Sequence, residues 1–265
     1  MKFIPLVAFF LLSIQSQGQV TDQLKKDQDR DPVQMRKQNL VALQTNYLYS
    51  LYYKVISEPK EILNGKEYLL YFFQSKTNPL FYSRDKFNAI LYINDRQYGN
   101  IKIQYDTYLD EIIYTDTSRI INYEFPKIAL NRDIIEGFSL CINGDSLRFR
   151  HLRFPPGSVD KLADGYYEIV YDGASKYIIK HRSVLYRRES LNEYKYAPIN
   201  YVRTGSSFID LRNKKNFVLI FGDKSQEIKT FLHKSKIRIN KANKYQIVVV
   251  LKYYDSLKTA GSQSK

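Results

Sequence analysis

From residue 61 to residue 222 the chain alternates short apolar segments with turn sequences, at a spacing of roughly ten residues. Apolar and polar residues alternate strictly between Ile101 and Tyr105, which is typical of a strand with one buried face. Asn143-Gly144 and Asp172-Gly173 each lie between two apolar segments and predict tight hairpin turns. No regular alternation of strands with helices is present, which disfavours a parallel α/β sheet. The sequence therefore predicts a β-rich α+β fold with an antiparallel, hairpin-rich sheet, arranged as a sandwich or a half-barrel.

The pattern changes near the C-terminus, where helices are expected. Asp223 followed by Gln226 resembles a capping box, and apolar residues then recur at helical spacing from Ile228. Residues 240–257 allow two interpretations, because their β-branched centre also suits a strand, and we favour a helix. The expected strands cover residues 68–73, 89–93, 98–105, 111–115, 138–142, 147–149, 166–171, 177–180, 199–203, 207–211 and 217–221.

The N-terminus has the three parts of a secretory signal peptide: a charged start at Lys2, a short apolar run, and small residues at Ser16 and Gly18. The apolar run falls well short of the roughly 20 residues of a membrane-spanning helix. For residues 40–56 the pattern fits a helix or a strand equally. The expected organisation is a signal peptide (1–18), a polar arm and helix (19–58), an antiparallel β domain (59–222, with an internal boundary at 154–165), C-terminal helices (223–258) and a tail (259–265).

Composition excludes several classes of protein. Of the 265 residues, 44% are hydrophobic and 15% aromatic, which is too apolar for a disordered chain. The single cysteine, Cys141, excludes an internal disulfide and any site with several cysteine ligands. It lies in the apolar run from Phe138 to Ile142, so we expect a buried thiol.

Several short segments resemble a group of uncharacterised exported proteins of the Bacteroidetes. The resemblance extends over most of the chain after the leader. It implies export and supplies no activity, substrate or cofactor. The segments are Asn64–Tyr68, Tyr105–Ile112, Gly165–Glu168, Tyr171–Gly173, Phe221–Lys224 and Tyr253–Leu257.

Common catalytic and nucleotide-binding motifs are missing from the sequence, including the P-loop, Gly-x-Ser-x-Gly and His-Glu-x-x-His. The three histidines, His151, His181 and His233, are far apart in the sequence and each has a Lys or Arg neighbour. A zinc site needs three or four ligands, so all three would have to converge with a carboxylate. We expect no metal ion and no cofactor.

An acidic cluster is the strongest chemical candidate, formed by Asp106, Asp110, Glu111 and Asp116. We favour a solvated hairpin whose aspartates make turn hydrogen bonds. Carboxylates at this density also suit Ca²⁺, which takes six to eight oxygen ligands. Asp106, Asp110 or Glu111 would alternatively serve as acid–base groups of a hydrolase.

The positive charge indicates an anionic partner. The formal net charge is +14, and the excess concentrates in the C-terminal third, where tyrosines are interleaved with the cations. Export disfavours nucleic acid and favours an envelope protein, lipopolysaccharide, an acidic glycan or lipid head groups. The candidate binding residues are Lys180, Arg182, Arg187, Arg188, Lys195 and Arg203.

These observations favour a non-enzymatic exported protein of the periplasm or outer membrane, or a secreted one, that binds a partner protein or an anionic envelope component. One alternative is a glycan- or lipid-directed hydrolase that uses the acidic cluster. A second is a carrier of apolar small molecules, with a cavity lined by Tyr and Phe.

Overall fold

The computed structural model divides into two units, residues 1–58 and 59–265. It describes residues 62, 64–69, 75–118, 120–154, 162–187, 192–211, 214–239 and 243–262, all of them in the second unit. The expected signal peptide (1–18) and polar arm (19–58) therefore lie outside the described residues. The same holds for most of the strand expected at 68–73 and for Arg188.

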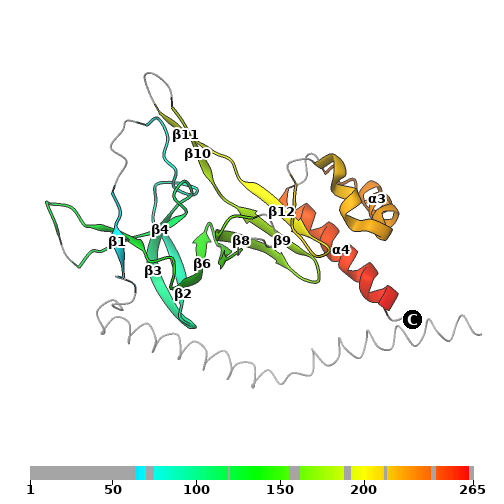
Figure 1. Ribbon diagram of the computed structural model, residues 1–265, viewed down its shortest axis with the longest axis horizontal. Coiled ribbons are helices and arrows are strands. Elements are labelled where there is room, and N and C mark those ends of the chain that lie inside the picture. Colours follow the sequence, from blue (N-terminus) through cyan, green and yellow to red (C-terminus); the bar gives the residue numbers. More distant parts are fainter. Residues whose placement is uncertain are drawn as a thin grey trace, which may run out of the picture. The chain divides into compact units, whose positions relative to one another are not determined.

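The described strands form one eleven-stranded sheet in the order β1-β5-β4-β3-β2-β6-β7-β8-β9-β12-β13, and β10 and β11 form a separate two-stranded sheet (Figure 1). All strand pairs within these sheets are antiparallel. The predicted hairpin-rich antiparallel sheet with C-terminal helices is confirmed. The strands are β1 (Gly65–Glu67), β2 (Phe87–Ile93), β3 (Arg96–Asp106), β4 (Glu111–Thr115), β5 (Lys127–Leu130), β6 (Ile135–Ile142), β7 (Asp145–Leu152), β8 (Gly165–Asp172), β9 (Lys176–Lys180), β10 (Ser183–Tyr186), β11 (Glu193–Tyr196), β12 (Ile199–Arg203) and β13 (Ile209–Asp210).

Two-residue turns connect neighbouring strands of the sheet. Asn143 and Gly144 join β6 to β7 with φ angles of 53° and 87°. Asn94 and Asp95 join β2 to β3 in the same way, with φ angles of 48° and 61°. Positive φ at both central residues defines the type I′ turn, whose twist matches that of paired strands. The hairpin predicted from Asn143-Gly144 is confirmed.

Aromatic rings fill the centre of the sheet. Phe138 on β6 and Phe149 on β7 are paired in register, and their rings stack at 4.5 Å between centroids. Tyr105 and Tyr166 meet the ring of Phe138 edge-on at 5.3 and 5.2 Å. Phe138 and Phe149 are fully buried, and the two tyrosines are 1% exposed. Ring-to-ring contacts of this kind stabilise a core beyond the area that they bury.

A 3-10 segment (η1, Lys214–Lys224) and two helices, α3 (Ser225–Lys234) and α4 (Lys244–Ser262), follow the sheet. They pack on one face of β8, β9 and β12, where Tyr177, Ile179 and Val202 share a core with Val250 and Leu251 of α4. The helix favoured for residues 240–257 is confirmed and begins at Lys244. Side chains alternate across a strand, so the residues between these point to the opposite face.

The strand expected at residues 217–221 is wrong, because these residues belong to the 3-10 segment. Phe217 and Phe221 are both 1% exposed, with their ring centroids 5.2 Å apart. Phe221 also contacts Tyr254 of α4 at 4.9 Å. Helical spacing brings both phenylalanines to one side, so packing against α4 overrides the β preference of the segment.

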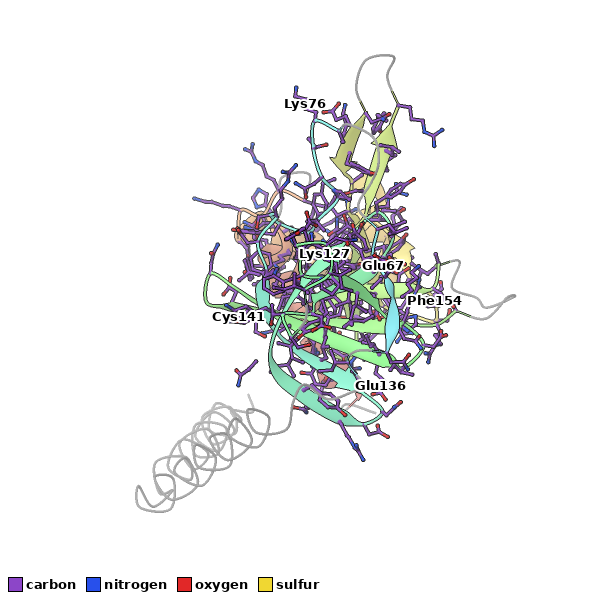
Figure 2. All side chains as sticks on the ribbon, turned by 90° about the vertical axis from the view of Figure 1, so that its left-hand side faces the viewer. Glu67, Lys76, Lys127, Glu136, Cys141 and Phe154 are labelled. Carbon is purple, nitrogen blue, oxygen red and sulfur yellow. The ribbon has the colours of Figure 1, made fainter. Side chains whose placement is uncertain are left out.

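The expectation of a buried cysteine is also wrong. Cys141 is exposed on β6 (Figure 2), while Leu140 and Ile142 on either side of it are buried. An apolar run in a strand with one buried face still presents alternate residues to solvent.

Replacement of Phe149 by Ala should lower the free energy of unfolding by about 3–5 kcal/mol, because it removes a fully buried ring and leaves a cavity beside Phe138. Urea unfolding followed by circular dichroism measures this loss. Leu219→Ala is the control, since Leu219 is 67% exposed, and should change stability by less than about 0.5 kcal/mol. Equal losses for the two variants would contradict the placement of Phe149 in the core.

Candidate anion-binding groove

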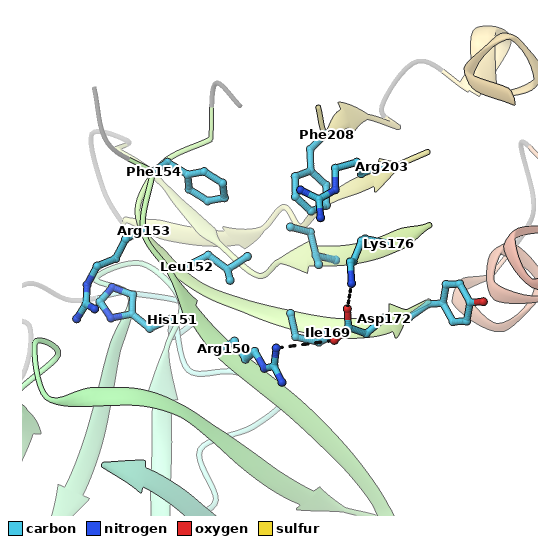
Figure 3. A pocket seen from close by; sticks show the side chains of 12 residues that line it. Arg150, His151, Leu152, Arg153, Phe154, Ile169, Asp172, Lys176, Arg203 and Phe208 are labelled. Carbon is cyan, nitrogen blue, oxygen red and sulfur yellow. Dashed lines mark hydrogen bonds and ion pairs between the residues drawn. The ribbon is translucent and has the colours of Figure 1, made fainter. Parts of the chain in front are cut away.

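The sheet face opposite the helices carries a groove of about 370 Å³, formed by β7, β8, β9 and β12 and the segments that follow them (Figure 3). The groove has a mixed lining, with cations around an apolar floor. The lining contains four cationic side chains and one carboxylate. These residues are Arg150, His151, Leu152, Arg153, Phe154, Ile169, Tyr171, Asp172, Lys176, Ile178, Arg203 and Phe208.

Asp172 neutralises part of this positive charge. Lys176 donates a hydrogen bond to its carboxylate, and Arg150 Nη1 lies 3.8 Å from Oδ2 (Figure 3). The hydrogen bond from Lys176 and the charge of Arg150 hold the pKa of Asp172 below its ordinary value, so the carboxylate stays ionised at neutral pH. One carboxylate cannot balance four cations, and the groove therefore has a net positive potential.

The floor of the groove is apolar because alternate residues of the same strands point away from the helices. Ile178 of β9 and Leu152 of β7 belong to a cluster with the buried Tyr167. Phe208 lies under the guanidinium group of Arg203, 4.8 Å from the ring centroid. An arginine held against an aromatic ring keeps its outer N–H groups available to an anion.

A partly buried ionic network lies at the start of β8, next to the groove. Asp110 Oδ1 is 2.8 Å from Lys180 Nζ and accepts a hydrogen bond of 2.5 Å from the Tyr105 hydroxyl. Its Oδ2 lies 3.4 Å from Arg132 Nη2. Burial lowers the pKa of Lys180, and Asp110 opposes this shift. Asp110 thus holds Arg132 in position beside His151, which lines the groove.

Arg132 connects this network to the groove wall. Its Nε donates to Nε2 of His151 over 3.2 Å, so the neutral imidazole carries its proton on Nδ1. Burial and the charges of Arg132 and Arg153 lower the pKa of His151. His151 therefore contributes a neutral ring to the groove, and the positive charge comes from lysine and arginine.

The predicted basic residues do not form one cluster. Lys180 is partly buried and pairs with Asp110, and Arg182 donates to the Ala197 carbonyl over 3.1 Å. Lys195 lies 4.9 Å from the ring of Tyr186, and Arg187 is exposed at the end of β10. Arg203 lies in the groove.

Sequence reasoning missed the partners of Arg203 in the groove, which are Arg150, Arg153 and Lys176. The run Arg150-His151-Leu152-Arg153 was a possible signal, because it sets cations at the end of a predicted strand. Arg150 and Arg203 line the same groove because of the order of the strands. A local sequence pattern carries no information about that order.

The four acidic residues of the predicted cluster make separate contacts. Asp106 is buried and accepts hydrogen bonds from the Tyr68 hydroxyl and from the amides of residues 108 and 109. Asp110 belongs to the network described above, Glu111 pairs with Lys66 at 2.5 Å, and Asp116 accepts from the amide of residue 118. Within the described part of the chain, no group of three or more His, Cys, Asp or Glu is arranged to hold a metal ion. The hydrolase hypothesis stays a prediction.

A second buried network, which the sequence did not indicate, joins β8 to α4. Glu168 accepts hydrogen bonds of 2.8 Å from both His181 Nε2 and Lys244 Nζ. The other ring nitrogen of His181 is hydrogen-bonded to the Tyr196 hydroxyl. Burial opposes ionisation of Glu168, yet the hydrogen bonds from His181 and Lys244 hold its pKa below the ordinary value. Burial lowers the pKa of His181, so this ring is neutral at pH 7.

Comparison with known proteins places the chain in no family, because no family, curated protein or solved structure matches it. In the described part of the chain, no helix has both the length and the apolar character needed to cross a membrane. Function is therefore inferred from the groove and from the surface of the described unit.

Protonation of His181 should destabilise the folded chain as the pH falls. In the unfolded chain the ring takes up a proton near its ordinary pKa of about 6.5, whereas burial keeps it neutral in the folded state. The stabilisation is therefore complete above about pH 6.5 and decreases toward pH 5. His151 contributes in the same direction.

Thermal unfolding at several pH values tests this prediction. His181→Gln should lower the melting temperature and flatten its dependence on pH between about 7 and 5, because the titrating group is removed. His233→Gln is the matched control, since His233 is exposed on α3. An unchanged slope in His181→Gln would contradict the buried neutral state of this ring.

Proposed function

We propose that this chain is a non-enzymatic, exported envelope protein that binds an anionic glycan or lipid head group in the groove of β7, β8, β9 and β12. One observation carries the proposal: four cations and a single carboxylate line a groove of about 370 Å³ with an apolar floor. The N-terminal leader pattern supports export, and the net charge of +14 supports an anionic partner.

The chemistry of the lining indicates the class of ligand. Guanidinium groups bind phosphate and carboxylate through two parallel hydrogen bonds, and Arg150 and Arg203 present such groups from opposite sides of the groove. The apolar side chains between them, including Ile169 and Phe208, suit the ring face of a sugar or the apolar part of a lipid. The shared chemistry is an oxyanion attached to a less polar body.

Two probes distinguish the sources of this anion. Alginate supplies sugar carboxylates without lipid, and vesicles with phosphatidylglycerol supply phosphate at a membrane. Arg150→Ala combined with Arg203→Ala should weaken binding to the preferred probe by about tenfold or more, since a hydrogen bond to a charged group contributes about 1.5–3 kcal/mol. Binding by the unmodified chain should weaken as salt rises.

Lys102→Ala is the control for loss of charge. Lys102 is an exposed cation on β3 and does not line the groove, so its removal should leave affinity nearly unchanged. The melting temperatures of all variants are measured to confirm folding. Equal affinity of the Arg150/Arg203 variant and the unmodified chain, or failure to bind either probe, would refute the proposal.

A further inference from the structure

The connection between β4 and β5 carries an exposed apolar tip. It reaches beyond β1, away from the rest of the sheet (Figure 1). Its four large apolar residues face solvent: Ile120 is 67% exposed, Ile121 49%, Tyr123 102% and Phe125 47%. Contiguous exposed apolar residues usually mark a surface that another molecule covers. We call residues 120–126 the β4–β5 tip.

Backbone hydrogen bonds fix the shape of the β4–β5 tip. The amide of Ile121 donates to the carbonyl of Glu124 over 2.9 Å, and the amide of Glu124 donates back over 3.0 Å. At the base, the amide of Asp116 donates to the carbonyl of Pro126 over 2.9 Å. The tip is therefore ordered before any partner binds, which removes an entropic cost of binding.

Tyr123 occupies a backbone position that favours glycine. Asn122 and Tyr123 have φ angles of 51° and 65°, the pattern of a type I′ turn. The same turn at Asn143-Gly144 has glycine at this second position. A bulky aromatic residue is strained there, and the fully exposed side chain of Tyr123 gains no burial that would offset the strain. Packing within the folded chain does not explain why a tyrosine occupies this strained position, whereas a contact with another molecule does.

The chemistry of the β4–β5 tip fits the interface of a lipid bilayer. Tyrosine is enriched at the level of the head groups, and shallow insertion buries isoleucine and phenylalanine about 5–10 Å deep. Lys127 lies four residues beyond the apex, at the start of β5, and Lys86 is near enough for its charge to act on Lys127. Lys127 at the base of the tip is therefore placed to meet lipid phosphates when the apex inserts.

Two acidic residues limit the electrostatic contribution. Glu124 follows Tyr123 in the tip, and Glu67 of β1 lies beside Lys127 at the base (Figure 2). Attraction between the tip and an anionic lipid surface is therefore modest. Burial of the four apolar side chains supplies most of the binding, and the positive charge of the whole chain favours anionic membranes.

We propose that the β4–β5 tip inserts Ile120, Ile121, Tyr123 and Phe125 shallowly into the interface of an anionic phospholipid bilayer and so docks the protein on a membrane surface. This inference goes beyond the groove, because it depends on different residues and on apolar insertion. An experiment can exclude membrane insertion of the tip without excluding anion binding in the groove, and the reverse also holds.

The absence of tryptophan from the sequence permits a direct test. Tyr123→Trp creates a single tryptophan at the apex, and its fluorescence is measured with vesicles of phosphatidylethanolamine and phosphatidylglycerol carrying brominated acyl chains. We expect a blue shift and quenching on vesicle binding. Tyr245→Trp on α4 is the matched control, since Tyr245 is 60% exposed on another surface, and should show neither change.

A tryptophan at position 123 that stays unshifted and unquenched would overturn the inference, whether or not the protein sediments with the vesicles. Sedimentation without quenching assigns vesicle binding to the groove and leaves the proposed function intact. A tip that fits a protein pocket instead of a bilayer also leaves the fluorescence unchanged with vesicles and overturns the inference. Quenching that persists in the Arg150/Arg203 variant supports the tip and separates it from the groove.

Tyr123→Gly separates stability from membrane binding. Glycine relieves the strained position, so the melting temperature should rise by about 2–4 °C. Vesicle binding should weaken about tenfold, because the most exposed apolar side chain of the tip is lost. A more stable variant that binds vesicles as well as the unmodified chain would contradict the role of Tyr123.

Discussion

Strands β8, β9 and β12 carry apolar side chains on both faces, and the arrangement of the C-terminal half of the described unit follows from this constraint. One face packs against α3 and α4 through Tyr177, Ile179 and Val202. The other face packs Ile178 and Tyr201 into a second cluster. A strand buried on both faces needs consecutive apolar residues, which the run Tyr177-Ile178-Ile179 supplies. The helices cover only one face, so the groove lies on the other.

Two carboxylates connect these layers: Glu168 is buried and Asp110 is partly buried. Asp110 binds Lys180 and Arg132, and Glu168 binds His181 and Lys244. The Asp110–Lys180 and Glu168–Lys244 pairs join segments that are far apart in the sequence. Removing Lys244 leaves the buried Glu168 carboxylate without its cation, and loss of one member of a buried ion pair typically costs about 3–5 kcal/mol. These contacts therefore impose one relative placement of β4, β9 and α4, and the cations of the groove depend on that placement.

Local features of the fold were predictable from the sequence, and features made by distant contacts were not. The alternation in β3 and the Asn143-Gly144 turn each lie within a few residues, so the pattern alone identifies them. The 3-10 segment depends on packing of Phe217 against residues that follow it. Lys180 was predicted to be a surface cation, yet it is partly buried in an ion pair with Asp110. The groove could not be predicted from the sequence, because Arg150 of β7 and Arg203 of β12 line the same groove only as a result of the strand order.

The turns between strands show where local preference and structure disagree. Asn143-Gly144 and Asn122-Tyr123 adopt the same turn, and only the first has the residue that this backbone favours. Sequences that fold well agree with their local backbone, and exceptions concentrate at functional sites. Burial of a tyrosine would offset the strain through packing, but Tyr123 is fully exposed. The strain at this apex therefore has its compensation outside the chain, which makes the β4–β5 tip a surface shaped for binding.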